Sequence, residues 1–205
     1  MSEQERLLIE RCQSGDVGSF EQLIGTHQQY VYNIAFRMMG NEEDAKDAAQ
    51  EALIKVFKNI GSYRHDSKFS TWLYRIVMNT CKDLLRKRKS NVISIDKGIA
   101  TDEGEVQMEF EDPNASPVRD YERKEVQETI QEAMEDLPEA NKSVLILREI
   151  KDYSYDEISD ILDIPVGTVR SRINRGRKML ADRLRERLPD HIPNRNTQRK
   201  GGERA

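Results

Sequence analysis

Residues 154–178 read SYDEISDILDIPVGTVRSRINRGRK, a pattern typical of two short helices joined by a tight turn. Ser154 and Glu157, three residues apart, form a capping box that starts the first helix, and Pro165 suits the first turn of the second. At about 100° per residue, the apolar positions of the second helix fall within one narrow sector, which we expect to be buried. They are Val169, Ile173, Gly176 and Leu180.

The opposite sector of this second helix carries donors that can reach base edges and phosphates in a major groove. Its members are Ser171, Asn174, Arg175 and Lys178, with Arg170 and Arg177 at the flank. Turn, cap and polar sector agree, which favours a helix-turn-helix that binds DNA. The alternative is a helical hairpin whose basic face meets only water.

The composition is that of a soluble protein with two small domains: 205 residues, of which 34% are charged and 37% hydrophobic. The chain has no run of about 18 apolar residues and a charged N-terminus, so we expect no membrane span, no signal peptide and a cytoplasmic location. Cys12 and Cys81 are too few for a disulfide framework and are interpreted as packed thiols. The three histidines lack ligand spacing, so no metal or other cofactor is predicted.

The net charge of −4 is distributed unevenly. Residues 91–118 carry seven acids and one base, a net of −6, which leaves the remainder of the chain at +2. Residues 82–89 hold five bases and one acid, and residues 170–187 hold eight bases and two acids. Two basic patches therefore flank an acidic connector.

Helical periodicity with Gly and Pro breaks predicts an all-α fold of two small domains. The predicted helices are 3–14, 18–39, 42–60, 70–89, 123–137 and 140–150, followed by the helix-turn-helix. The predicted divisions are a helical N-terminal bundle 1–90, a flexible acidic linker 91–120, a helix-turn-helix domain 121–188 and a disordered tail 189–205.

The helix predicted at 42–60 begins at Asn41, a plausible N-cap, and has acids in its first turn. Polar residues project from the side opposite its alanine-rich stripe: Asp47, Gln50, Glu51, Lys55 and Lys58. From spacing alone, a binding face and a face that meets only water look the same.

Before and within the helix predicted at 70–89, aromatic residues alternate with bases. The aromatics are Tyr63, Phe69, Trp72 and Tyr74, beside Arg64, Lys68, Arg75 and Lys82. This composition suits single-stranded or distorted nucleic acid, where bases stack on rings and phosphates meet cations. Trp72 and Phe69 equally suit packing in the core, which is the favoured interpretation for Trp72.

Three segments in this order resemble the extracytoplasmic-function sigma factors, the two-domain class of bacterial promoter-specificity subunits, and most closely the sigma-E type. The segments are DAAQEALIKVFKNI, FSTWLYRIVMNTCKDLLRKRK and YSYDEISDILDIPVGTVRSRINRGRKML. The resemblance covers residues 7–187. It implies that the first domain binds core RNA polymerase and opens the minus-10 promoter element, and that the second reads the minus-35 element. Catalysis would belong to the polymerase, so the chain itself is not expected to be an enzyme.

Carried over residue by residue, the resemblance nominates three sets of contacts. The core polymerase contacts are Asp47, Gln50, Glu51 and Lys55. The contacts to the single-stranded minus-10 element are Asn79, which would face a flipped base, and the neighbouring cations Arg75 and Lys82. The contacts to the minus-35 duplex are Arg170, Ser171, Asn174 and Arg175, with Thr168, Arg177 and Lys178 on phosphates.

The resemblance also implies partners and a role. Factors of this class usually serve stress responses and are held inactive by an anti-sigma protein, often a membrane protein; activity controlled only by expression is the alternative. The acidic linker would thread through polymerase channels that otherwise hold nucleic acid, or act as a simple tether. A small-molecule substrate is not expected. The rival interpretation of the whole chain is a stand-alone helix-turn-helix regulator, which would not bind core polymerase.

Overall fold

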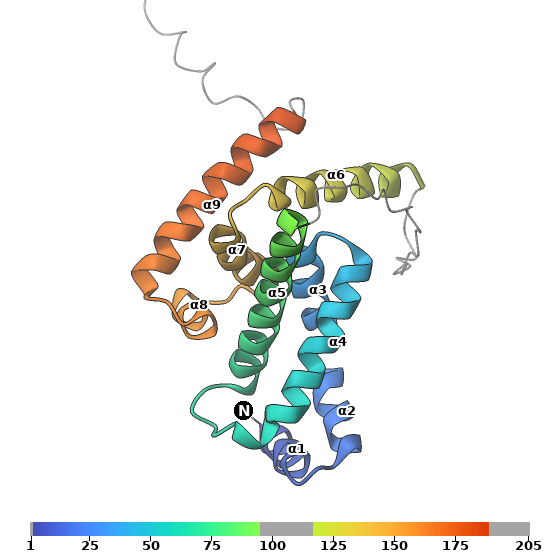
Figure 1. Cartoon of the computed structure of the whole chain (residues 1–205), viewed down its shortest axis with the longest axis vertical. Coiled ribbons are helices and arrows are strands. Elements are labelled where there is room, and N and C mark those ends of the chain that lie inside the picture. The colour runs from blue at the N-terminus through green and yellow to red at the C-terminus, as the bar shows by residue number, and fades with distance from the viewer. Residues whose placement is uncertain (1, 95–116, 189–205) are drawn as a thin grey trace, which may run out of the picture.

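The computed structural model describes residues 2–94 and 117–188, and within these ranges every regular element is helical (Figure 1). The first half contains α1 (Glu3–Gln13), α2 (Val17–Gly25), α3 (Gln28–Met39), α4 (Glu42–Asn59), the short 3-10 helix η1 (Ile60–Ser62) and α5 (Phe69–Ser94). The second half contains α6 (Pro117–Glu135), α7 (Glu139–Lys151), α8 (Tyr155–Leu162) and α9 (Val166–Arg187). The predicted all-α class is confirmed. Among these helices, none combines the length and the apolar character that a membrane span requires.

Local capping explains where helices of the first half begin. Side-chain oxygens of Ser2, Asp16 and Asn41 accept hydrogen bonds from backbone N–H groups in the first turns of α1, α2 and α4. The Asn41 cap is the one predicted from sequence, and its Oδ1 lies 2.9 Å from the backbone nitrogen of Asp44. Helices α3, α4 and α5 pack against one another and hold the core of this half, while α1 packs on α2.

The single helix predicted at 18–39 is wrong, because the structure has two helices there, α2 and α3. The break falls at Gly25–His27, where glycine is a weak helix former and the chain turns inward. His27 is buried, and its Nδ1 lies 3.0 Å from the Tyr74 hydroxyl of α5. A contact across 47 residues thus fixes the break, and Gly25 was the only local signal for it.

Helix α5 extends beyond its predicted end at 89 as far as Ser94, and α6 begins at Pro117, before its predicted start at 123. The predicted linker 91–120 therefore begins within α5 and ends within α6. Its central part, 95–116, and the predicted disordered tail 189–205 lie outside the described residues.

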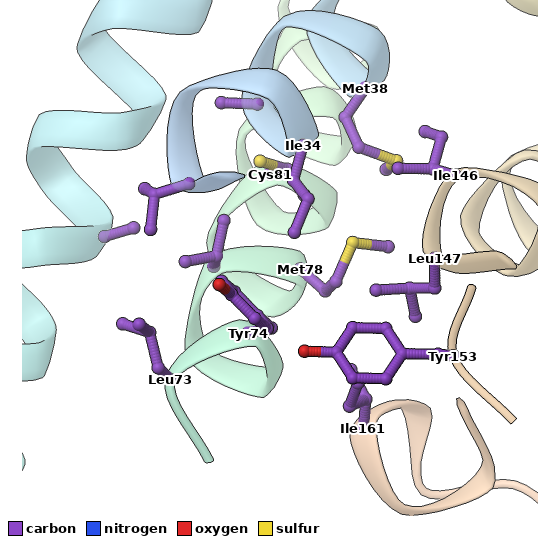
Figure 2. Packing of buried hydrophobic residues seen from close by; sticks show 14 of the residues in the cluster. Ile34, Met38, Leu73, Tyr74, Met78, Cys81, Ile146, Leu147, Tyr153 and Ile161 are labelled. Carbon is purple, nitrogen blue, oxygen red and sulfur yellow. The ribbon is translucent and has the colours of Figure 1, made fainter. Parts of the chain in front are cut away.

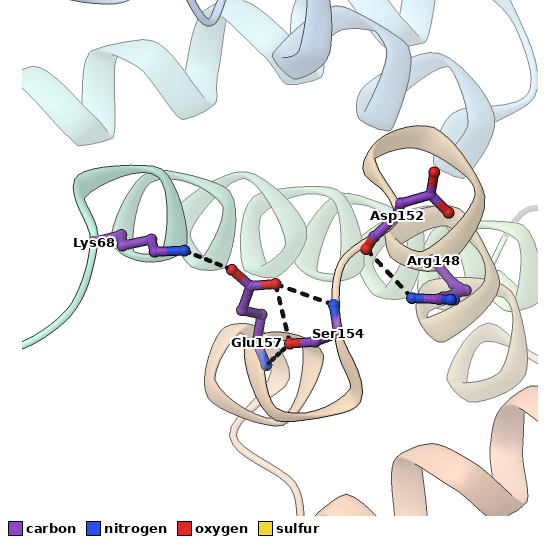
Figure 3. A network of polar contacts seen from close by, with 5 residues as sticks. All are labelled: Lys68, Arg148, Asp152, Ser154 and Glu157. Carbon is purple, nitrogen blue, oxygen red and sulfur yellow. Dashed lines mark hydrogen bonds and ion pairs between the residues drawn. The ribbon is translucent and has the colours of Figure 1, made fainter. Parts of the chain in front are cut away.

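In the second half, α8 and α9 form the predicted helix-turn-helix. The capping box is present: the backbone nitrogen of Glu157 donates to Ser154 Oγ, and the Glu157 carboxylate accepts from the backbone nitrogen of Ser154. Asp163 ends α8 in the left-handed conformation, at a φ of 54°, which Asp tolerates better than most residues. Just after the end of α7, Arg148 donates to the carbonyl of Asp152 (Figure 3) and to that of Tyr153.

The two halves pack against each other and share one buried cluster. Helix α3 lies on α7, and α5 lies on α8 (Figure 1). Figure 2 shows side chains from both halves side by side within this cluster: Met38, Met78, Ile146, Leu147 and Tyr153. In this closed arrangement, the contacts between the halves determine how their outer surfaces lie relative to each other.

Candidate nucleic-acid interface

The outward face of α9 carries the predicted minus-35 residues. Arg170, Asn174 and Arg175 are exposed, and Ser171 is half-buried with its hydroxyl donating to the Thr168 carbonyl at 3.0 Å. The opposite side is buried through Val169, Ile173 and Gly176, as the periodicity predicts. Leu180, the fourth member of that predicted sector, is half-buried. The helix therefore presents a continuous set of hydrogen-bond donors outward, in the arrangement that suits a major groove.

Gly176 brings α9 close to α7. A Cβ at this position would lie 2.9 Å from Leu145 Cδ1 and 3.4 Å from the Asn141 carbonyl oxygen. Leu145 is itself buried, so it has little room to move away. This close approach fixes the rotation of α9 about its axis and hence the outward direction of Asn174 and Arg175.

The predicted phosphate contacts flank the predicted base-reading residues. Thr168 is half-buried in the first turn of α9, where backbone N–H groups also point outward. Arg177 and Lys178 are exposed, and Arg177 pairs with Glu149 of α7 at 3.0 Å. Both ends of that pair are more than half exposed, so the arginine is free to exchange its partner for a phosphate.

The predicted minus-10 residues lie along α5 in unequal surroundings. Asn79 is exposed, whereas Arg75 and Lys82 are half-buried. Arg75 donates to the backbone carbonyl of Asp160 in α8, and its Nε is buried without a hydrogen-bond partner. Burial lowers the pKa of Lys82, the cations Arg172 and Arg86 lower it further, and Glu139 opposes them.

The aromatic residues around the start of α5 pack mainly inward. Tyr63, Phe69 and Tyr74 are buried, and only Trp72 is partly exposed, with its ring 5.4 Å from that of Tyr63 and 5.9 Å from that of Phe69. Trp72 packs against the core cluster, as its favoured interpretation predicts. These rings hold the loop before α5 in place, and Trp72 alone has an exposed surface on which a base can stack.

The predicted polymerase face of α4 is accessible. Asp47 and Gln50 are exposed, and the half-buried Glu51 and Lys55 pair with each other at 2.7 Å. Apolar side chains continue this face: Ile54 is 47% exposed and Phe57 is 37% exposed. From the sequence, only the polar residues of this face were predicted. The spacing of Ile54 and Phe57 from Gln50 and Glu51, three to seven residues, already places them on the same side of a helix.

A groove of about 1550 Å³ runs beside this face between the two halves. Apolar side chains from both halves line it, including Phe20, Phe57, Ile130, Met134 and Leu180. The ring of Phe57 meets that of Phe20 edge-on at 5.0 Å. The groove is thus an apolar surface that depends on how the halves are packed.

Both cysteines are buried thiols in this fold, in line with the interpretation from sequence. Burial raises the pKa of Cys12, and it raises the pKa of Cys81 to about 12, so neither is poised to act as a thiolate. Within residues 2–94 and 117–188 no three His, Cys, Asp or Glu side chains gather in a way that would hold a metal ion.

The structure does not bring the three predicted contact sets onto one surface. The α9 set and the α4 set face outward on different halves, while part of the α5 set contacts α8. Sequence reasoning missed the residues that make the contacts between the halves. Among them, Lys142 is buried and donates to the Met38 carbonyl at 3.0 Å, across 104 residues.

Comparison with known families explains this two-part arrangement. The chain matches Sigma-70 region 2 at residues 23–91 and Sigma-70 region 4 at residues 127–180. It is 37% identical to the RNA polymerase sigma-H factor of Pseudomonas aeruginosa over 191 residues, which cover 91% of this chain and 96% of the relative. The chain belongs to the ECF family of RNA polymerase sigma factors. It therefore directs transcription initiation, and a stand-alone regulator is not favoured.

Two further ECF sigma factors are similar to this chain over most of its length. The ECF RNA polymerase sigma factor SigW of Bacillus subtilis is 37% identical over 179 residues, covering 87% of this chain and 95% of its own. The ECF RNA polymerase sigma-E factor of Escherichia coli is 35% identical over 190 residues, covering 90% and 97%.

Two solved structures share the fold of this sigma factor. CnrH, in complex with the cytosolic domain of CnrY, has a TM-score of 0.62 and 23% identity, and the match covers 90% of this chain and 99% of that one. The sigma factor RpoE of Bartonella quintana, in complex with the anti-sigma factor NepR, has a TM-score of 0.65 and 21% identity, with 82% and 98% covered.

Proposed function

We propose that this sigma factor binds bacterial core RNA polymerase through α4, reads the minus-35 duplex with α9 and holds the melted minus-10 strand with α5. It contributes recognition and positioning, and the polymerase carries out the chemistry, so the chain itself is not an enzyme. The observation that carries the proposal is the outward donor set of α9 on a helix fixed from behind by Gly176.

For the minus-35 element, Arg170 and Arg175 each suit a guanine edge, which offers two acceptors to one guanidinium. Each such bidentate contact contributes about 1 to 3 kcal/mol of discrimination between bases. Asn174 and Ser171 supply donors and acceptors for the neighbouring base pairs. Thr168, Arg177 and Lys178 anchor the phosphates on either side and set the register of the helix in the groove.

For the minus-10 element, Asn79 is the group best placed to read a base, because it is exposed and its amide both donates and accepts. Flipping a base out of the duplex costs a few kcal/mol, and edge hydrogen bonds together with stacking offset that cost. Arg75 and Lys82 supply the cations that follow the strand. The exposed part of Trp72 is the adjacent stacking surface.

For core polymerase, the docking face consists of Asp47, Gln50, Glu51 and Lys55. The exposed Ile54 and Phe57 add apolar area to it, which a purely polar face would lack. A face that combines exposed aromatic and aliphatic side chains with a polar rim has the composition of a protein interface. Nothing in this arrangement requires DNA, so core binding and promoter reading are separable.

Further parts of the role follow from the relatives. The sigma factor acts in the cytoplasm, where core polymerase is, and serves a stress response, as the names sigma-E and SigW suggest. An anti-sigma protein controls it, as NepR is described as an anti-sigma factor of the Bartonella quintana RpoE, and a membrane-anchored partner of this kind is compatible with the fold. The apolar groove between the halves is a surface that such a partner can bind.

The test is reconstituted run-off transcription. The purified chain is added to bacterial core RNA polymerase on a library of promoter fragments, and the transcript starts are sequenced. Starts that share two spaced upstream elements are expected. Absence of added initiation together with absence of co-elution with core polymerase would contradict the proposed function.

A further inference from the structure

We infer that contacts between the two halves limit access of single-stranded promoter DNA to α5. Tyr153 and α8 of the second half bind the start of α5, so α8 and the promoter strand compete for this part of α5. This inference rests on the proposed role of α5 and adds an internal competitor to it. The contacts that make up this interface, called the α8 latch below, are those of Tyr153, Glu157 and Asp160 with Lys68, Ser70, Tyr74 and Arg75.

Tyr153 is the apolar part of the α8 latch. Its ring lies 6.1 Å from that of Tyr74 at 64°, and a hydrogen bond joins its side chain to Ser70, so two of its contacts come from the other half. Only 7% of Tyr153 is exposed, and burial raises the pKa of its hydroxyl to about 12. Separation of the halves would therefore expose a large ring and break a hydrogen bond.

Glu157 is the charged part. Its Oε1 accepts a hydrogen bond from Lys68 Nζ at 2.8 Å, while its Oε2 accepts from the Ser154 backbone nitrogen at 3.0 Å (Figure 3). One carboxylate thus completes the capping box of α8 and neutralises a cation at the start of α5. Lys68 is 69% exposed, so a phosphate can compete for it, and this ion pair is the weaker part of the interface.

The α5 residues themselves indicate competition between α8 and a nucleic-acid strand. Arg75 is turned toward α8, where it donates to the Asp160 carbonyl and leaves Nε buried without a partner. Lys82 is half-buried, and burial lowers its pKa, while Glu139 of the other half opposes the charges of Arg172 and Arg86. A phosphate chain would satisfy the Arg75 guanidinium, but only after the halves separate.

A second set of hydrogen bonds, away from the α8 latch, also joins the two halves. Lys142 of α7 donates to the Met38 carbonyl in the last turn of α3, where carbonyls lack partners within the helix. Beside it, Gln131 of α6 donates weakly to the Phe36 carbonyl at 3.5 Å. A cation placed at the negative end of a helix favours closure independently of the α8 latch.

The test compares the full-length wild type with Tyr153→Ala, using small-angle X-ray scattering and the fluorescence anisotropy of a labelled, random-sequence single-stranded 12-mer. Binding to the open form alone makes the measured dissociation constant inversely proportional to the open fraction. We expect Tyr153→Ala to increase the radius of gyration and to tighten binding by about three- to tenfold. Tyr155→Ala is the matched control, because its ring lies 5.8 Å from Arg148 of its own half.

Glu157→Gln tests the same interface without large packing loss, since glutamine also serves in a capping box. It should shift both measurements in the same direction by less, and it keeps the inference testable even if Tyr153→Ala unfolds. Equal compactness and equal affinity of wild type and Glu157→Gln at low salt would overturn the inference. So would expansion of Tyr153→Ala without any gain in strand binding. Failure of the proposed function has a different signature: no variant would support initiation with core polymerase, whatever its compactness.

Discussion

Three of the four proposed base-reading residues of α9 are exposed, whereas Arg75, one of the three predicted minus-10 residues on α5, donates to a carbonyl of the other half of the chain. Both helices are amphipathic and both carry a basic cluster, so composition does not separate them. The difference lies in what packs on them. Helix α9 is fixed from behind by α7 and leaves its donors free, while α5 meets α8 on the side that bears Arg75.

The two proposed promoter surfaces are therefore available under different conditions. Duplex recognition by α9 needs no rearrangement, because Arg170, Asn174 and Arg175 already face outward. Strand capture by α5 needs α8 to move, and that movement exposes part of the shared core. The cost makes capture of the minus-10 strand dependent on the binding energy of polymerase and promoter together.

The largest expected effect is that of Arg175→Ala. Loss of one bidentate contact to guanine should cost about 1 to 3 kcal/mol, a reduction of roughly 5- to 150-fold in transcription from promoters that depend on the minus-35 element. Core binding should be unchanged, because the proposed contacts with core polymerase lie on α4. Run-off transcription and co-elution with core polymerase measure the two quantities separately.

Arg177→Ala is the contrast for that experiment. Loss of a phosphate contact should weaken binding similarly on all promoter sequences and reduce its salt dependence by about one counterion, without relaxing base preference. Loss of core binding in the Arg175→Ala protein would refute the division of labour between α9 and α4.

Next in size is Glu51→Lys on the third surface. Charge reversal at the centre of the predicted docking face should weaken core association by about tenfold and leave DNA affinity of the free chain unaltered. A binding titration of labelled sigma factor with core polymerase measures the effect. Glu10→Lys, at an exposed position of α1 away from this face, controls for charge reversal as such. Unchanged core affinity would remove Glu51 from the docking face.

A smaller effect is expected from Asn79→Ala. Its amide contributes one or two edge hydrogen bonds to a flipped base, so opening of the minus-10 element should fall by about fivefold, near 1 kcal/mol. Permanganate reactivity of thymines in the promoter reports opening directly. A pre-melted promoter that retains the defect would assign Asn79 to base reading, whereas rescue by pre-melting would leave it a role in strand separation only.

The parts of the fold that are local in sequence were predictable. Ser154 and Glu157 form the capping box within four residues, and the 3.6-residue period of α9 identifies its buried side correctly at Val169, Ile173 and Gly176. The break at Gly25 was missed because the decisive contact, His27 with Tyr74, spans 47 residues. Local patterns do not contain such information.

The contact between the halves escaped prediction for a related reason. Lys68 and Glu157 are 89 residues apart, and each has a sufficient local explanation: Lys68 as an exposed loop cation, Glu157 as a capping residue. From the sequence alone, Tyr153 is likewise indistinguishable from any aromatic residue that packs within its own domain. The sequence predicts which residues donate to DNA but not which of them another part of the chain already engages.

The smallest effect is the pH dependence of the Lys68–Glu157 pair. Lys68 and Ser154 donate hydrogen bonds that hold the pKa of Glu157 below its usual 4.5, and Glu157 raises the pKa of Lys68 above its usual 10.5. A lowered acid pKa stabilises the closed form above pH 4.5, and this contribution disappears as the pH falls through the lowered pKa. The raised pKa of Lys68 stabilises the closed form below pH 10.5, and this contribution disappears as the pH rises through the raised pKa.

The difference in free energy of unfolding between wild type and Glu157→Gln should therefore be constant between about pH 5 and 10 and diminish on both sides. Denaturant titrations at several pH values measure it, and high salt should reduce it because the lysine is exposed. If the two residues act as a pair, the difference in free energy of unfolding between wild type and Lys68→Gln should diminish in the same way at acid pH. A difference that grows below pH 4 would mean that Glu157 destabilises the closed form when charged, and that α8 is held on α5 by Tyr153 alone.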